Sequence, residues 1–426
     1  MSSNFALKSK PKKSLINKMA TIIIIVLAIL VIGLDHLVSE RLTLSLYGVL
    51  ILAYILQKVI FSYFYNRRYF KKIKNVNEED ISLDVCVPFY NEDKALIIEC
   101  IDSILLQKKI ILKNLIIVDD GSTSRSLYNL LKKKYENNQL VTIISMSINS
   151  GKRAALHESF KYINSNFIAL LDSDSSLDNH YTLSNIIRAF DRKTALVTAV
   201  AEANNERENF FTRILNVRLK NAFLIERPAQ AYFNSVLVGS GMLTVYRKAI
   251  LENHKEELVN QTFFGIKQTF GDDRMLTGCA LEHGKTIIAM DAVCKTRVAS
   301  TITEFISQQI RWNKSFFRES FLFISKFGVL KAAGFLSFME VFFWIFYLNA
   351  VIQTVFFNFY VGFWTLFITY LAYIFSAGIF RNITIIYKNP QMILLYPLYS
   401  VIHIIVLTPI RLYSLLTLLN KKLIKN

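Results

Sequence analysis

The stretch Gly271-Asp272-Asp273-Arg274 places two adjacent carboxylates beside a guanidinium. A carboxylate can act as a general base when it is held at a reacting hydroxyl and kept ionised, and Arg274 would favour the ionised form. The same residues would also suit the first turn of a helix, because the helix dipole favours Asp there. On this motif alone, a catalytic base and a helix start both remain open.

A second acidic motif, Asp172-Ser173-Asp174, directly follows the apolar run Phe167–Leu171. Alternate residues of an extended chain point to the same side, so the two carboxylates should lie together. Hard oxygen ligands at this spacing suit Mg²⁺ or Mn²⁺ bridging a diphosphate. An EF-hand loop is excluded, because Leu177 and Leu183 stand where that loop needs glycine and glutamate. A solvated surface loop remains the alternative.

Two further motifs carry cations. Lys152 and Arg153, which follow Gly151, could bind a nucleotide diphosphate through charge-assisted hydrogen bonds. A P-loop is excluded, because Met146 occupies the position of its first glycine and no Ser or Thr follows the lysine. The second motif, Gln308-Gln309-Ile310-Arg311-Trp312, offers a ring that can stack on a pyranose and a guanidinium that can hold a diphosphate. Membrane interfaces also select Trp and Arg, so an interfacial anchor remains equally open.

The histidines and cysteines indicate no further chemistry. Histidines such as His157 and His180 form no HxxxH or similar ligand set, so we interpret them as structural. The four cysteines show neither metal spacing nor a pairing pattern, which is typical of reduced cytosolic residues. They are Cys86, Cys100, Cys279 and Cys294.

The elements that must position these motifs begin at Ile81, where strand and helix patterns start to alternate. This alternation predicts an α/β domain with a mixed, mostly parallel sheet. Ligands of such sheets bind at the carboxyl ends of the strands, where three strand ends would bring polar groups to one edge. The first four expected strands are Ser82–Pro88, Leu115–Val118, Thr142–Met146 and Phe167–Leu171.

Apolar runs on both sides of this domain predict membrane spans. With 53% hydrophobic and 13% aromatic residues among 426, the chain is too apolar for an ordinary soluble protein. Met19–Val38 is long enough to cross a bilayer, and no cleavage site follows it, so we expect an uncleaved anchor. About six spanning elements are expected in all. The other candidates are Thr43–Tyr65, Phe335–Phe357, Phe359–Ile379 and the proline-interrupted run Met392–Leu419.

The net charge of +18 is concentrated in clusters beside these apolar runs. Such clusters are typical of juxtamembrane anchors on the cytosolic side. No basic and aromatic recognition motif accompanies them, so we expect no nucleic-acid partner. The organisation expected is a basic cytosolic N-terminus at 1–18, a transmembrane hairpin at 19–65, a basic linker at 66–80, a cytosolic catalytic domain at 81–300, interfacial amphipathic helices at 301–330, transmembrane channel helices at 331–420 and a basic tail at 421–426.

Taken in order, these motifs resemble those of processive family 2 membrane glycosyltransferases. The set also includes Tyr90-Asn91-Glu92 and Val118-Asp119-Asp120-Gly121-Ser122. Flanking residues are similar to those of the bacterial class I hyaluronan synthases, over nearly the whole chain. These are Asn221-Ala222-Phe223, Glu226-Arg227, Ala229-Gln230, Asn260-Gln261-Thr262-Phe263 and the run from Trp312 to Glu319.

The resemblance implies a cytosolic GT-A catalytic domain at the plasma membrane, a channel made by the membrane helices, and Mg²⁺ or Mn²⁺ as cofactor. It implies UDP-GlcNAc, UDP-GlcA, the nascent polysaccharide and membrane lipids as partners, with no obligate protein partner. By the same resemblance, Asp273 with Asp272 provides the base, Asp174 and Asp172 hold the metal and nucleotide, and Asp120 contacts the uridine. The rest of the implied substrate site is Tyr90, Glu92, Asp119, Lys152, Arg153, Gln308, Arg311 and Trp312.

Two departures from the family pattern concern the acceptor and the exit. The Cys-Ser-Gly-Pro beside the acceptor reads Gly239-Ser240-Gly241-Met242 here, and a Trp-Gly-Thr gating segment does not follow Leu419. A chitin-like or other capsular polymer synthase is the alternative within the same class. A transporter with a nucleotide-binding domain is disfavoured because a regulatory site needs no acceptor base, and a lipid-linked sugar transferase is disfavoured by the acceptor-type Trp312 motif.

Overall fold

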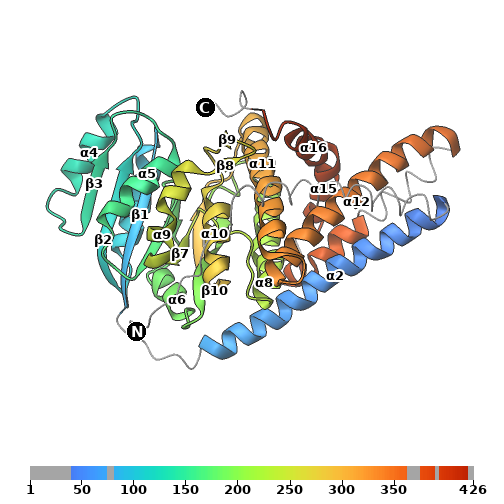
Figure 1. Ribbon diagram of the computed structural model, residues 1–426, viewed down its shortest axis with the longest axis horizontal. Coiled ribbons are helices and arrows are strands. Elements are labelled where there is room, and N and C mark those ends of the chain that lie inside the picture. Colours follow the sequence, from blue (N-terminus) through green and yellow to red (C-terminus); the bar gives the residue numbers. More distant parts are fainter. Residues whose placement is uncertain (1–39, 74–80, 362–374, 389–392, 421–426) are drawn as a thin grey trace.

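The structure, a computed structural model, describes residues 40–73, 81–361, 375–388 and 393–420. Figure 1 shows an α/β domain built on one large sheet and a group of long helices that extend from one side of it. The predicted span Met19–Val38 lies outside the described residues, as does most of the predicted span Phe359–Ile379. The α/β domain carries both acidic motifs.

Eight strands form the sheet, in the order β3-β2-β1-β4-β7-β6-β10-β5. Pairing is parallel from β3 to β4 and between β6 and β10, and antiparallel where β7 joins β4 to β6 and where β5 borders β10. The predicted mixed, mostly parallel sheet is confirmed. The strands are β1 (Ser82–Phe89), β2 (Ile111–Asp119), β3 (Val141–Ser145), β4 (Phe167–Leu170), β5 (Ser175–Leu177), β6 (Thr194–Ala203), β7 (Thr244–Arg247) and β10 (Lys285–Thr296). A separate small hairpin pairs β8 (Thr262–Phe263) with β9 (Ile266–Lys267).

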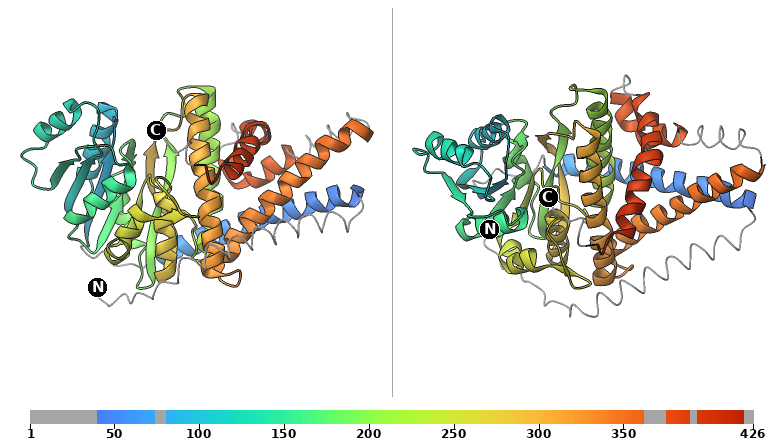
Figure 2. Two further views of the ribbon diagram at one scale, coloured as in Figure 1. Left: turned by 45° about the horizontal axis from the view of Figure 1, so that its top comes forward. Right: turned by 90° about the horizontal axis from the view of Figure 1, so that it is seen from above.

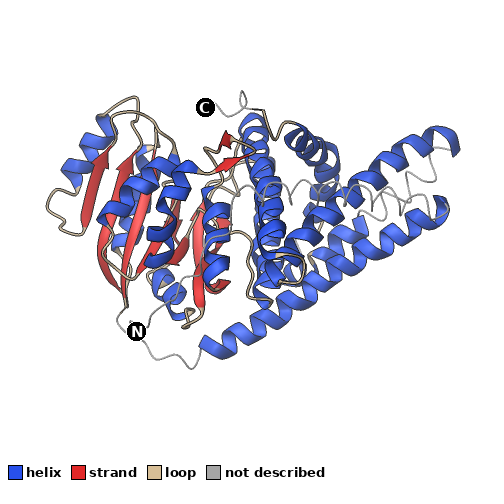
Figure 3. Cartoon of the chain, viewed as in Figure 1, coloured by secondary structure: helices blue, strands red, loops and turns tan. Residues whose placement is uncertain are grey.

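Helices cover both faces of the sheet (Figure 3). They are α3 (Lys94–Leu105), α4 (Ser126–Lys134), α5 (Lys152–Ser159), α6 (Thr182–Arg188), α7 (Phe210–Asn221), α8 (Arg227–Tyr232), α9 (Lys248–Asn260) and α10 (Asp272–His283). Successive residues of β2 enter different cores: Leu115 and Ile117 join one hydrophobic cluster, Ile116 and Val118 the other. A strand buried on both faces therefore reads as an unbroken apolar run, which is why the sequence reveals it.

The long helices beside the domain are α2 (Glu40–Ile73), α11 (Ile302–Phe327), α12 (Ala332–Val361), α14 (Ile383–Lys388), α15 (Leu395–Ile402) and α16 (Thr408–Leu416). Figure 2 shows α2 and α12 running side by side away from the sheet. Among the described residues, three helical stretches are long and apolar enough to cross a membrane: Val49–Ile73, Ala332–Asn349 and Leu395–Leu416. They overlap three of the predicted spans.

Two of these helices differ from the sequence prediction. Helix α2 continues through the first half of the predicted linker 66–80, and its Tyr65 and Tyr69 hydroxyls donate to the Ile288 carbonyl and the Asp291 carboxylate, each at 2.5 Å. This helix therefore packs directly on the sheet. The region 301–330, predicted as interfacial helices, contains the single long helix α11, whose Arg318 is only 1% exposed. It packs against α10, α12 and α16, and its place relative to a membrane stays a prediction.

Candidate active site

A cavity at the carboxyl ends of the central strands brings the acidic motifs together. Its polar lining comprises Lys152 at the start of α5, Asp172 after β4, Asp272 and Asp273 at the start of α10, and the loop Gly239-Ser240-Gly241. Pro88, Leu171 and Tyr246 contribute apolar lining. Segments separated by more than a hundred residues in the sequence thus meet at one edge of the sheet, as parallel topology predicts.

Lys152 links the two acidic motifs. Its Nζ forms one ion pair with Asp172 and another, at 3.2 Å, with Oδ2 of Asp272. Burial alone would lower the pKa of Lys152, but these two carboxylates raise it well above its usual value. The lysine is therefore a fixed positive charge between the strand-end carboxylate and the helix-start carboxylate.

The two carboxylates of the helix motif differ in proton affinity. Burial would raise the pKa of Asp272, but Lys152 and Arg153 outweigh it and the pKa falls. The pKa of Asp273 is raised by burial and by the neighbouring Asp272, and Lys152 and Arg274 only partly oppose the rise. Asp273 is therefore the better proton acceptor, because a general base works best when its pKa lies closer to the operating pH.

Arg274 contacts the Asp273 carboxylate through its backbone. Its backbone N–H donates to Oδ1 of Asp273 at 2.8 Å, while its guanidinium lies 5.2 Å above the ring of Phe316. Arg274 lowers the pKa of Asp273, as the sequence suggests, but burial and Asp272 outweigh it and the pKa is raised. Both sequence interpretations of the motif hold in position: Asp272 and Asp273 start α10, and both line the cavity.

A buried network that the sequence did not reveal fixes the loop before Asp272. Arg318 of α11 donates to the Phe270 carbonyl at 2.9 Å, to Oε1 of Gln268 at 2.5 Å and to Oε1 of Glu319 at 2.7 Å. Gly271 has φ +79°, and a Cβ there would lie 2.2 Å from Oγ of Ser315. The loop therefore accepts only glycine at this position. In the sequence, the only sign of this network is the run from Trp312 to Glu319, which resembles the family but suggests no physical role for Arg318.

Arg153 belongs to this network rather than to the cavity lining. It is 3% exposed, and its guanidinium donates to the carbonyls of Phe270 at 2.9 Å and Leu258 at 3.2 Å. The sequence prediction placed this residue on a diphosphate, because residue type gives a charge but not its direction. The structure instead directs the side chain towards the backbone that precedes Asp272.

The loop Gly239-Ser240-Gly241 is tied to both motifs. The Gly239 N–H donates to Oγ1 of Thr277 at 2.8 Å, and that hydroxyl donates to the carbonyl of Asp273 at 2.6 Å. The carbonyl of Gly241 accepts from the Asp172 N–H at 3.0 Å, and a Cβ at Gly241 would lie 2.9 Å from Oδ2 of Asp172. The predicted acceptor loop therefore lies against the candidate base and the strand-end carboxylate.

The loops after β1, β2 and β3 form the side of the site predicted for the nucleotide. Oδ1 of Asp120 accepts from the Ser150 N–H at 2.9 Å, and Oδ1 of Asp119 accepts from the Ser122 N–H at 2.9 Å. Both aspartates are at most 3% exposed, whereas Tyr90 is 44% exposed. Asp119 and Asp120 thus bind loop backbone here, and their predicted contacts with substrate stay predictions.

The donors around Asp174 fit a hard divalent cation. Burial, then Asp172 and Glu92, raise the pKa of Asp174 to about 7. Oε2 of Glu92 accepts from the Ser173 hydroxyl at 2.6 Å, which holds this carboxylate beside the motif. The charges of Asp172 and Glu92 disfavour a charge on Asp174, and Mg²⁺ or Mn²⁺ prefers carboxylate oxygens as ligands. The residues therefore suit the predicted metal.

The motif from Gln308 to Trp312 lies on α11 and is not part of the cavity lining. Trp312 is 40% exposed, with the Arg218 guanidinium 5.3 Å from its ring. Arg311 donates to the Ser307 hydroxyl at 3.3 Å, and Gln308 is partly buried. The roles predicted for these three residues towards diphosphate and acceptor stay predictions.

Comparisons with known proteins agree with this fold. Residues 84–255 match the family described as Glycosyl transferase family 2. The chain is 32% identical over 384 residues to a hyaluronan synthase of Streptococcus pyogenes, covering 89% of this chain and 90% of that protein. It is 31% identical over 243 residues to an N-acetylglucosaminyltransferase of Azorhizobium caulinodans, covering 56% of this chain and 61% of the relative.

A solved structure shares the fold. It is a mannosyltransferase from Pyrobaculum calidifontis in complex with GDP-Man and Mn²⁺, with a TM-score of 0.58 and 17% identity. The match covers 89% of this chain and 99% of that one, which supports the GT-A arrangement of the sheet. The extent of the streptococcal match and the matching family 2 domain place the chain in the hyaluronan synthase family of inverting, processive family 2 glycosyltransferases.

Proposed function

We propose that this protein polymerises UDP-GlcNAc and UDP-GlcA into an alternating β-linked polysaccharide and passes the product across the plasma membrane. One observation carries the proposal. Lys152 binds one carboxylate of each acidic motif, and Asp273, in the same cavity, has a raised pKa. The streptococcal hyaluronan synthase, matched over nine tenths of its length, supports this choice of polymer.

In the proposed reaction, Asp273 accepts the proton of an acceptor hydroxyl. The freed oxygen lone pair forms a bond to the anomeric carbon of the donor sugar, and the bond from that carbon to the diphosphate oxygen breaks on the opposite side. UDP leaves with the electron pair of that bond. Because the new bond forms on the face opposite the leaving UDP, the configuration at the anomeric carbon inverts. Asp272, held by Lys152, remains ionised beside the base and raises its proton affinity.

Asp174, with Asp172 and Glu92, would hold the Mg²⁺ or Mn²⁺ ion. When bound there, such an ion supplies positive charge that stabilises the negative charge developing on the departing diphosphate. The protein contribution is the fixed position of the donors, because Ser173 donates to Glu92 and Lys152 holds Asp172.

For the route of the polymer, the polar residues of α12 provide the starting point. Oε1 of Glu340 accepts from Nε2 of Gln230, on α8 of the catalytic domain, at 2.7 Å. This carboxylate therefore faces protein, neither reaching out to the membrane surface nor serving as a free pore group. Asn349 lies further along the same apolar stretch and remains the polar group proposed to face the product, while the side chain of Gln353 lies outside the described residues.

A second candidate is a polymer of GlcNAc alone. The relative from Azorhizobium caulinodans, matched over 243 residues, is named an N-acetylglucosaminyltransferase. The two candidates differ only in whether the donor site admits a uronate as well as an N-acetyl sugar.

The experiment incubates membranes containing the full chain with UDP-GlcNAc alone, UDP-GlcA alone, and the pair, with Asp273→Asn membranes as the control. We expect high-molecular-weight product only from the pair, and complete digestion of it by a hyaluronan-specific lyase. Polymer from UDP-GlcNAc alone would replace the first proposal with the second. Absence of polymer under all three conditions, with UDP release in the Asp273→Asn membranes equal to that of the unaltered protein, would contradict both.

A further inference from the structure

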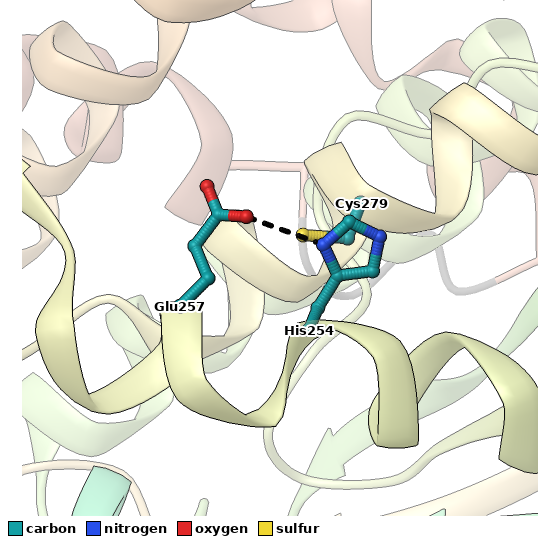
Figure 4. Close-up of side chains that lie close together, drawn as sticks. All are labelled: His254, Glu257 and Cys279. Atoms are coloured by element: carbon teal, nitrogen blue, oxygen red, sulfur yellow. Dashed lines mark hydrogen bonds and ion pairs between the residues drawn. The ribbon is translucent and has the colours of Figure 1, made fainter. Parts of the chain in front are cut away.

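Helices α9 and α10 bring a histidine, a glutamate and a cysteine together outside the lining of the substrate cavity. His254 and Glu257 lie one turn apart on α9, and Cys279 faces them from α10 (Figure 4). One ligand atom of each residue lies within 4.8 Å of the others. Figure 4 shows the imidazole, the sulfur and the carboxylate converging on one point.

The three side chains differ in kind from the donors around Asp174. His254 and Cys279 are 1% and 3% exposed, and Nδ1 of His254 lies 3.3 Å from Oε2 of Glu257. An imidazole nitrogen with a sulfur and one carboxylate oxygen is a borderline-soft set, which favours Zn²⁺ over Mg²⁺. Tetrahedral Zn²⁺ with bonds of about 2.0 to 2.3 Å separates its donors by roughly 3.3 to 3.8 Å, so only a small closing movement is required.

We propose that His254, Glu257 and Cys279 form a structural site for Zn²⁺ or a chemically similar transition-metal ion, distinct from the metal site of glycosyl transfer. Glu257 is partly exposed, which leaves room for water as a fourth ligand. The site connects α9 to α10 through one atom from each of three side chains.

His283, one turn after Cys279 on α10, completes the arrangement. Its Nε2 lies 3.1 Å from Nε2 of His254. If Nδ1 of His254 binds the metal, the proton of the neutral imidazole resides on Nε2, where it donates to Nε2 of His283. Metal-binding histidines commonly donate their second N–H in this way, which fixes the tautomer and the ring orientation.

The thiol also determines the course of binding. Burial raises the pKa of Cys279 well above its usual value, so the metal-free protein carries a protonated sulfur. On binding, the S–H bond breaks, a bond from sulfur to metal forms, and the proton passes to solvent. The sequence does not reveal this set, because its residues come from two separate helices. His254 and Glu257 lie on α9, Cys279 and His283 lie on α10, and neither pair alone makes a metal motif.

The location of the site gives it a mechanical consequence. Cys279 follows Asp273 by six residues on the same helix, which corresponds to about 9 Å along the axis. A metal bridge at this point would hold the helix that carries the candidate base against α9. This bridge would be present whichever sugars the enzyme polymerises.

The test uses the purified full chain in detergent, stripped with a chelator and titrated with Co²⁺, whose charge-transfer band in the near ultraviolet reports a thiolate ligand. We expect the band to saturate at one ion per chain and to disappear when Zn²⁺ is added. Cys279→Ser should abolish the band and weaken Zn²⁺ binding at least about 100-fold. Loss of the outer partner in His283→Ala should weaken Zn²⁺ binding about 10- to 100-fold.

Two controls and one alternative ligand variant make the result specific. Cys86→Ser replaces another buried cysteine and should retain the band, and Asp174→Asn should retain it because the hard-metal site contains no thiol. Should Cys279→Ser fail to fold, Glu257→Gln alters a partly exposed ligand and should still weaken Zn²⁺ binding about tenfold or more. Absence of a thiolate band at one equivalent of Co²⁺, or a band that Cys279→Ser retains, would overturn the proposal.

Discussion

The two acidic motifs use the same residue type in different surroundings. Each pair gives one carboxylate to Lys152: Asp172 from the strand end and Asp272 from the helix start. In each pair the other carboxylate has a raised pKa, which for Asp174 is about 7. Both of these aspartates keep an elevated proton affinity although Lys152 lowers the pKa of each.

The neighbours of these two aspartates assign them different tasks. After burial, the groups that raise the pKa of Asp174 are both acidic, Asp172 and Glu92, and this excess of negative charge is suited to a divalent cation. Asp273 has one acidic neighbour, Asp272, and two opposing cations, Lys152 and Arg274. Its charge is therefore nearly balanced, which suits a group that must accept and release a proton.

The largest effect is expected from Asp273→Asn, which keeps the shape of the side chain and removes its basic oxygen. Polymer formation should fall by about 10² to 10⁴, the typical contribution of a general base, while UDP affinity changes less than about twofold. Initial rates in membranes and UDP titration of the purified protein measure the two quantities. Asp178→Asn, which alters an acidic residue paired with Lys295, is the matched control. A variant that keeps more than about a tenth of the normal rate would remove Asp273 from the base role.

Asp174→Ala should act on the metal site with a somewhat smaller effect. Mg²⁺ usually relies on one or two carboxylates and the phosphates, so loss of this ligand should remove most of the gain in UDP affinity that a metal confers. Titration of UDP with and without Mn²⁺ measures that gain, with Asp178→Ala as the control. An equal gain in the variant and the unaltered protein would show that the ion binds elsewhere.

Lys152→Gln should affect both pairs at once and move the pH dependence. Activity requires ionised Asp273, so it is lost as the pH falls through the pKa of that group. Because Lys152 lowers this pKa, its removal should shift the acidic limb upward by on the order of one pH unit and lower the rate about tenfold at pH values below that limb. A pH profile of UDP release measures the shift, and the exposed Lys161→Gln serves as the control. An unmoved limb with a lower rate would reduce Lys152 to a packing role.

The strands and motif positions were predictable because their burial leaves a local signature. Expected strand ends at β1 and β4 agree with the structure within one residue, since a strand buried on both faces is apolar throughout and its polar loop begins abruptly. Parallel topology implied that Lys152 lies near both acidic motifs. It did not predict the ion pairs of Lys152, because these form only when three segments distant in the sequence come together.

Contacts between distant segments account for what the sequence did not reveal. Arg318 and Gln268 are 50 residues apart, and neither lies in a motif with a recognisable chemical role. Arg153 has the charge of a phosphate ligand but is directed to backbone carbonyls. The Zn²⁺-type cluster of α9 and α10 was missed for the same reason, because helix packing rather than spacing brings Cys279 to His254.

The smallest effect concerns stability, and it distinguishes directly between Asp174 and Asp273, the two aspartates whose pKa is raised. In the folded protein the pKa of Asp174 is about 7, above its ordinary value of 3.8. Below pH 4 the group is protonated in both states and costs nothing. As the pH rises to about 7, the unfolded chain loses this proton more readily than the folded one, so the free energy of unfolding falls and stays lower above pH 7. Asp174→Asn should therefore stabilise the metal-free protein at pH 8 and change its stability much less at pH 4.

Thermal unfolding in detergent with a chelator, at pH 4 and pH 8, measures this difference. Asp273→Asn should show a gain of the same sign at pH 8, because its pKa is also raised. Excess Mn²⁺ should then distinguish the two residues. A bound ion stabilises only a protein that retains its ligands, so Mn²⁺ should raise the unfolding midpoint of Asp273→Asn and leave that of Asp174→Asn unmoved. Equal responses of the two variants to Mn²⁺ would mean that the motifs share one electrostatic role, and the division between metal ligand and base would be lost.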